Sequence, residues 1–124
     1  MSLKPITVLR RARKLIADRN AWIKGAFIGK RKGVQCYCAL GALATGAGVK
    51  VANGQTLSNA DSGGLPTEYY VAHQLLKKAI GDGFSQWVPS FNDDNRTQHA
   101  DVLKMFDKAI ELAKAESAAS TPAA

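Results

Sequence analysis

The sequence predicts a mainly α-helical protein: a compact bundle of about four helices, with a small β-hairpin between the first and second helices. Three segments, near residues 5–19, 66–80 and 97–113, carry apolar residues at helical spacing. The chain has 124 residues, which is the usual size of one domain. It contains no apolar run of the ~20 residues that a membrane helix needs, so no membrane partner is expected.

The first predicted helix covers residues 5–19. Pro5 suits the first helical position, where its missing N–H costs nothing, and Asn20 is a suitable stop. The apolar face of this helix consists of Val8, Leu9, Ala12, Leu15 and Ile16. Residues 22–37 follow as two short β-prone runs around a glycine-bounded basic turn, which predicts a hairpin or an ordered loop.

The middle of the chain predicts two more helices. Residues 38–45 are apolar nearly all round, which is typical of a helix at the centre of a core. A glycine-rich loop at 46–64 leads to a third helix at 66–80, which opens with proline and closes before glycine.

The last part of the chain predicts a connector and a fourth helix. Residues 84–91 are expected to be extended. The fourth helix begins near Thr97, with Asn95 or Thr97 as its cap. We therefore expect a single helical domain over residues 1–116 and a disordered C-terminal tail over 117–124.

Positive charge is concentrated in the first third of the chain. The formal net charge is +7, and ten of the 17 lysines and arginines lie in the first 32 positions, opposed there by Asp18 alone. From Asp61 onward, six basic residues face nine acidic ones. This asymmetry indicates an anionic partner, although it also fits solubility and the association of opposite ends of two copies. We accordingly expect a homo-oligomer, most simply a twofold dimer.

The candidate ligand-binding residues are five basic side chains in two groups. Lys30, Arg31 and Lys32 share the predicted turn, where a docked anion would relieve their mutual repulsion and form charge-assisted hydrogen bonds. Arg10 and Lys14 lie one turn apart on the first helix and offer a second basic surface. If the turn folds back over the helix, or meets a neighbouring subunit, the two groups could enclose a phosphate-bearing ligand.

Cys38 offers a different chemistry. It begins the second predicted helix, where the helix dipole lowers the pKa of a thiol. His73 and a carboxylate from Asp93 or Asp94 would complete a cysteine-dependent catalytic set. The competing interpretation, which we favour, is that Cys38 is a small buried side chain.

A metal site is disfavoured. Cys36, Cys38, His73 and His99 are potential zinc ligands, but the Cys-x-Cys spacing departs from the usual pattern and the histidines do not form a pair. We expect no cofactor. Two closely spaced cysteines also fit a reducing, cytoplasmic compartment, in which both remain thiols.

Several motifs occur in an order that resembles a known family. They are Trp22-Ile-Lys-Gly25, Cys38-Ala-Leu-Gly-Ala-Leu43, Phe91-Asn92-Asp93, Arg96-Thr97, Asp101-Val102-Leu103 and Phe106-Asp107-Lys108-Ala109. Together they resemble a family of unknown function that occurs in phage genomes and in bacteria, especially actinobacteria. The resemblance brings no known activity and no functional residue. It implies a phage or prophage accessory context, with the host cell cytoplasm as the compartment.

The expected function is a non-enzymatic binding protein that captures an anionic ligand, such as a nucleotide signal of host defence. One alternative is a module that binds nucleic acid or a host protein through the basic first helix, whose surface could lie along a phosphate backbone. The other is a cysteine-dependent enzyme centred on Cys38. Steep salt dependence of binding would indicate nucleic acid, and a reactive thiol would indicate the enzyme.

Overall fold

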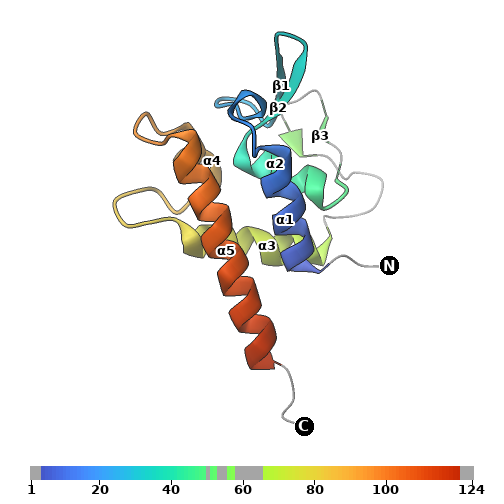
Figure 1. The fold of residues 1–124 in the computed structure, drawn as a ribbon, viewed down its shortest axis with the longest axis vertical. Helices are drawn as coiled ribbons and strands as arrows, with labels where there is room; N and C mark the ends of the chain where they lie inside the picture. Colours follow the sequence, from blue (N-terminus) through green and yellow to red (C-terminus); the bar gives the residue numbers. More distant parts are fainter. Residues whose placement is uncertain (1–3, 50, 53–55, 58–65, 121–124) are drawn as a thin grey trace.

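The computed structural model describes residues 4–49, 51–52, 56–57 and 66–120. Its helices are α1 (Pro5–Leu15), α2 (Ala39–Gly46), α3 (Thr67–Ala79), α4 (Val88–Asp93) and α5 (His99–Ser120), with a short 3-10 helix, η1 (Arg19–Ala21). Its strands are β1 (Ile28–Arg31), β2 (Val34–Tyr37), β3 (Val51–Ala52) and β4 (Thr56–Leu57). The predicted fold class, mainly helical with an antiparallel hairpin between the first two helices, is confirmed (Figure 1).

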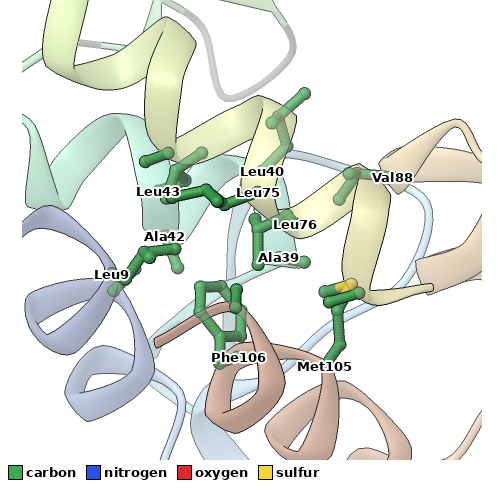
Figure 2. Close-up of a cluster of buried hydrophobic side chains, with 14 of the residues drawn as sticks. Leu9, Ala39, Leu40, Ala42, Leu43, Leu75, Leu76, Val88, Met105 and Phe106 are labelled. Atoms are coloured by element: carbon green, nitrogen blue, oxygen red, sulfur yellow. The ribbon is translucent and has the colours of Figure 1, made fainter. Parts of the chain in front are cut away.

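Helix α2 lies at the centre of the core. Seven of its eight residues are buried, which explains why its sequence is apolar on every side. Helices α1, α3 and α4 all pack against it, and α5 packs against α1 and α3. Figure 2 shows Ala42 and Leu43 of α2 in one cluster with Leu9 of α1, Leu75 of α3 and Phe106 of α5.

Two glycines of α2 permit unusually close packing. A Cβ on Gly46 would lie 2.9 Å from the carbonyl oxygen of Val8, so α1 approaches α2 backbone to backbone. A Cβ on Gly41 would lie only 1.9 Å from the carbonyl oxygen of Phe27. The segment that leads into the hairpin therefore rests directly on α2 at a position where no side chain fits.

The hairpin of β1 and β2 projects away from the helices (Figure 1). Its turn is formed by Lys32 and Gly33, both with positive φ (52° and 80°), as in the two-residue turns that match the twist of a hairpin. Its base is fixed because the N–H of Cys38 donates to the carbonyl of Phe27 at 3.1 Å. The tip is thus presented to solvent on a short, anchored ribbon.

The first helix ends earlier than predicted. Helix α1 stops at Leu15 instead of continuing through residue 19. The carbonyl of Ile16 accepts a hydrogen bond from Nε2 of His99 at 2.6 Å, and the side chain of Asp18 caps η1. These contacts take the chain out of the helical path, although Ile16 itself remains buried in the core.

The prediction of an extended connector at 84–91 is wrong at its C-terminal end. Helix α4 begins at Val88, and Pro89 lies in its first turn, where a missing N–H leaves no hydrogen bond unmade. The proline that suggested an extended chain instead starts a helix. The side chains of Val88 and Phe91 then fill the core beside α2.

Helix α5 extends beyond its predicted end and runs through Ser120, so residues 117–120 of the predicted tail are helical. Residues 121–124 of that tail lie outside the described residues. Most of the predicted glycine-rich loop at 46–64 also lies outside them, and its described part contains the paired strands β3 and β4. In the part of the chain that is described, no helix has the length and apolar character needed to cross a bilayer.

Candidate anion-binding site

The structure separates the two groups of basic residues chosen from the sequence. Lys30 and Lys32 lie exposed at the tip of the hairpin, while Arg10 and Lys14 lie exposed on the surface of α1. The hairpin points away from the helices, so its turn does not fold back over α1 (Figure 1). Within one copy of the chain, these residues therefore do not enclose a ligand.

Arg31 differs from its two neighbours because it reaches the body of the protein. Its guanidinium donates to the carbonyl of Trp22 at 2.7 Å. This contact ties the hairpin to the segment that follows η1 and brings one positive charge close to it. That segment, residues 19–24, is the first wall of the candidate site.

Asn92 holds this first wall in place. It is fully buried at the end of α4, and its side chain makes four hydrogen bonds. Its Oδ1 accepts from Nε1 of Trp22 at 2.7 Å and from the N–H of Ala39 at 3.0 Å. Its Nδ2 donates to the carbonyl of Ile23 at 3.1 Å and to Oδ1 of Asp93 at 2.9 Å. A buried amide with all of these partners fixes α2, α4 and the Trp22 segment relative to one another.

Lys24 is positioned by the loop that follows α4. Its Nζ donates to the backbone carbonyl of Asp94 at 2.7 Å and lies 5.6 Å from the centre of the Trp22 ring. The neighbouring N–H of Gly25 donates to Oδ1 of Asp93 at 3.0 Å. Lys24 contacts a carbonyl oxygen and forms no direct ion pair among the described residues, although its charge also acts on the nearby carboxylate of Asp94.

The N-terminal end of α5 is the second wall of the candidate site. His99, the first residue of α5, joins this wall to residues 19–24. Its Nε2 must carry the proton in the 2.6 Å contact with the carbonyl of Ile16, since a carbonyl only accepts. Its ring also packs against the ring of Trp22, with centroids 5.8 Å apart. The N-terminal end of α5 is thereby fixed beside residues 19–24.

A surface pocket of about 480 Å³ lies between these two walls. Its lining residues are Arg19, Trp22, Lys24, Thr97, Gln98, His99 and Ala100. We call it the basic pocket. Two of the lining residues are cations and none is a carboxylate, so the pocket favours an anion.

The first turn of α5 adds hydrogen-bond donors to the basic pocket. The carboxylate of Asp101 accepts from the N–H of Gln98 at 2.8 Å, which caps the helix. The N–H groups of His99 and Ala100 have no acceptor among the described residues. Unpaired N–H groups at the start of a long helix carry partial positive charge and attract anions.

Thr97 supplies a further polar group in the same wall. The residue is 2 % exposed, and its hydroxyl has no hydrogen-bond partner in the described part of the protein. A buried hydroxyl without a partner is unfavourable, and such groups are rare in native proteins. Thr97 thus places a buried hydroxyl without a described partner in the wall of the basic pocket, an observation independent of the helix end.

A comparison with protein families agrees with the motifs in the sequence. The profile of DUF6197, described as a family of unknown function, matches residues 1–112. The chain belongs to DUF6197. No curated protein and no solved structure matches the chain. The match covers both walls of the basic pocket and all of α1, α2, α3 and α4, so the site lies within the part that defines the family.

Cys38, the candidate nucleophile of this DUF6197 chain, lies outside the basic pocket. It lines a smaller hollow of about 160 Å³ together with Phe27, Pro89 and Asp93. Cys38 is 3 % exposed, and burial raises the pKa of its thiol to about 11, with a smaller contribution from the negative charge of Asp93. At neutral pH it therefore keeps its proton, and its Sγ accepts a hydrogen bond from the N–H of Gly41 at 3.3 Å.

The histidine proposed for a catalytic set is occupied elsewhere. The ring of His73 packs between those of Tyr69 and Trp87, with centroid distances of 5.8 and 5.7 Å. Burial lowers the pKa of His73, and the charge of Lys77 lowers it further. Among the described residues, no group of three or more His, Cys, Asp or Glu side chains could hold a metal ion.

Sequence reasoning missed most of the basic pocket. In the sequence, Arg19 and Lys24 are two of ten basic residues in the N-terminal third, and His99 is only a potential zinc ligand. The available signal was the closeness in sequence of Arg19, Trp22 and Lys24, two cations and an aromatic residue within six positions; in the structure Lys24 lies over the Trp22 ring. What the sequence could not supply was the second wall, because His99 and Ile16 are 83 positions apart.

Proposed function

We propose that this protein captures a phosphate-bearing small molecule in the basic pocket and does not convert it. One observation carries the proposal: Arg19 and Lys24 line the same hollow as the first turn of α5, whose His99 and Ala100 N–H groups have no described acceptor, and none of the lining residues is a carboxylate. Cations, backbone N–H groups and a helix N-terminus are the groups that proteins use to hold phosphate.

Capture without conversion is supported by the composition of the pocket. Its lining contains no cysteine, serine or carboxylate. Cys38, whose pKa is raised, opens into a different hollow. We therefore assign the pocket a binding role, and the resemblance to phage proteins motivates the further proposal that the ligand is a nucleotide signal of host defence.

The basic residues outside the pocket have a supporting role in this proposal. Lys30 and Lys32 on the hairpin, together with Arg10 and Lys14 on α1, create a positive field around the N-terminal third. Such a field raises the rate at which anions arrive, and its effect falls with ionic strength. These four side chains are expected to influence association rates more than dissociation rates.

Nucleic-acid binding is the second candidate function. It is favoured by Arg10, Arg11 and Lys14, which are exposed along α1 and form no ion pair with any described residue. A polyanion lying along α1 and the hairpin would contact many charges at once. Its affinity would then fall steeply with salt, whereas binding in the basic pocket involves few charges and should fall gently.

Calorimetry with a panel of linear and cyclic nucleotides, at two salt concentrations, tests the proposal. The decisive variant is Arg19→Gln with Lys24→Met, which removes both pocket cations and keeps the aliphatic stem of Lys24 beside Trp22. Each charge-assisted hydrogen bond contributes about 1.5–3 kcal/mol, so we expect the affinity to fall at least ~10-fold.

The matched control removes the same number of charges elsewhere. Lys30→Gln with Lys32→Asn changes the net charge equally, and asparagine tolerates the positive φ at position 32. We expect this control to retain the affinity within about threefold at moderate salt, because these exposed charges act at long range. Equal losses in both double variants, or no binding by the unmodified protein to any nucleotide, would refute a site in the basic pocket.

A further inference from the structure

We infer that the basic pocket recognises a terminal phosphate monoester in preference to the internal phosphodiester of a nucleic-acid strand. This inference rests on the proposed function and names its ligand class. It follows from the number of hydrogen-bond donors in the pocket, from their charge, and from the unpaired hydroxyl of Thr97.

The donors of the pocket come from two facing walls. On one wall, the consecutive N–H groups of His99 and Ala100 point out of the start of a helix 22 residues long. On the other wall, Lys24 uses one of its three N–H donors on the carbonyl of Asp94, which leaves two for a ligand. The guanidinium of Arg19 adds donors of its own and makes no hydrogen bond or ion pair within the described chain.

A terminal phosphate matches this set of donors better than an internal one does. A monoester presents three unesterified oxygens, whereas a diester presents two and carries an ester substituent on each side. Arg19, Lys24 and two backbone N–H groups line the pocket from two different segments, and the three unesterified oxygens of a monoester can be directed to both segments at once. A diester has two such oxygens, and its second ester oxygen, a poor acceptor, occupies the position of the third, so donors that face it lose part of their hydrogen bonding.

The charge of the pocket favours the same ligand. Arg19 and Lys24 contribute two positive charges, and no carboxylate lines the hollow. A monoester carries about −1.5 to −2 charges at neutral pH, while an internal diester carries one. The monoester thus offsets both cations, and the partial positive charge at the start of α5 adds to its preference.

Thr97 gives this inference a signature that a structural role would not produce. Its hydroxyl is buried, lacks a partner, and belongs to the residue that precedes the α5 cap. A phosphate oxygen seated at the first turn of α5 would provide the missing acceptor. Thr97→Val should therefore raise the thermal unfolding midpoint of the ligand-free protein, because an unsatisfied hydroxyl is removed, and should weaken phosphate binding at the same time.

Two dinucleotides that differ by one group test the inference. Thymidylyl-thymidine has one internal diester, and its 5′-phosphorylated form adds one terminal monoester; thymidine 5′-monophosphate has the monoester alone. Calorimetry should show the 5′-phosphorylated dinucleotide binding at least ~10-fold more tightly than the unphosphorylated one, as the additional charge-assisted contacts imply. The monophosphate should bind about as tightly as the phosphorylated dinucleotide, and Thr97→Val should weaken both.

The outcomes separate the inference from the proposed function. Equal affinities for the two dinucleotides would overturn the monoester preference and leave phosphate capture standing. Affinity that instead grows with the length of an unphosphorylated thymidine oligonucleotide would overturn the preference in favour of strand binding. Failure of all three ligands to bind would overturn both. A Thr97→Val variant that is less stable than the parent would show that the hydroxyl has a structural partner, and would remove that support from the inference.

Discussion

Replacing Asn92 by alanine is the most informative single perturbation of this fold. The side chain of Asn92 is completely buried and joins three segments that are far apart in the sequence. Truncation removes the acceptor of the Trp22 indole N–H and of the Ala39 N–H, and the donor to the carbonyl of Ile23. No other described side chain replaces these contacts.

The magnitude follows from the groups that lose their partners. A buried donor left without an acceptor costs about 1–3 kcal/mol; the Ala39 N–H is such a donor, and the part-buried indole N–H of Trp22 is a second one at the lower end of that range. The carbonyl of Ile23 is only partly buried and can be solvated, so it adds less. We expect Asn92→Ala to lower the free energy of unfolding by ~3–5 kcal/mol, a large share of the 5–15 kcal/mol typical of a domain.

Urea unfolding, followed by circular dichroism and by tryptophan fluorescence, measures this loss. Asn95→Ala is the control, because Asn95 is exposed nearby, and it should change stability by less than ~0.5 kcal/mol. Trp22 should also become more mobile in Asn92→Ala, and nucleotide affinity should fall because Lys24 is no longer positioned. A loss of stability below ~1 kcal/mol would refute the reasoning, since it would mean that the four hydrogen bonds contribute almost nothing.

Three further changes test the packing and the charges around the same segment. Gly41→Ala places a Cβ 1.9 Å from the carbonyl oxygen of Phe27, so urea titration should show a loss of at least ~2 kcal/mol; a neutral effect would contradict the close approach. Cys38→Ala should lower the free energy of unfolding by only about 1 kcal/mol. The thiol of native Cys38, with its pKa raised to about 11, should resist alkylation at neutral pH, and rapid labelling would restore the enzyme hypothesis. The contact with Arg96 lowers the pKa of Asp94 from 3.8 to about 2. The carboxylate therefore stabilises the fold above pH 3.8 and loses this effect as the pH falls toward 2. Asp94→Asn should flatten that part of the acid unfolding curve, and an unchanged curve would refute the assignment.

Helices α1, α2, α3 and α5 could be predicted from the sequence because each of them carries a local apolar pattern. Val8, Leu9 and Ala12 of α1 recur at helical spacing, and all three are buried. The central position of α2 followed from its apolar character on every side. The hairpin followed from two glycines around a basic turn, and Gly33 does adopt the positive φ that the turn requires.

The errors in the sequence analysis arose where distant contacts or a proline decided the local structure. The end of α1 depends on His99, which binds the carbonyl of Ile16 from the far end of the chain. Pro89 looked like a mark of extended chain, but the same residue is compatible with the first turn of a helix, and core packing by Val88 and Phe91 selects the helix. Local patterns do not distinguish these outcomes.

The candidate site was harder to predict than the fold because it depends on which charges have partners. In the sequence, nothing distinguishes the cations Arg13 and Arg96 from Arg19 and Lys24. In the structure, Arg13 and Arg96 each pair with a carboxylate at 3.0 Å or less, while Arg19 and Lys24 face the basic pocket without a carboxylate partner among the described residues. Exposed ion pairs contribute little to stability, so pairing the pocket cations as well would have cost the fold nothing. Neutral contacts of a buried asparagine and a histidine hold two cations without partners beside unpaired N–H groups. An anion site requires this arrangement. A fold selected for stability alone does not require it.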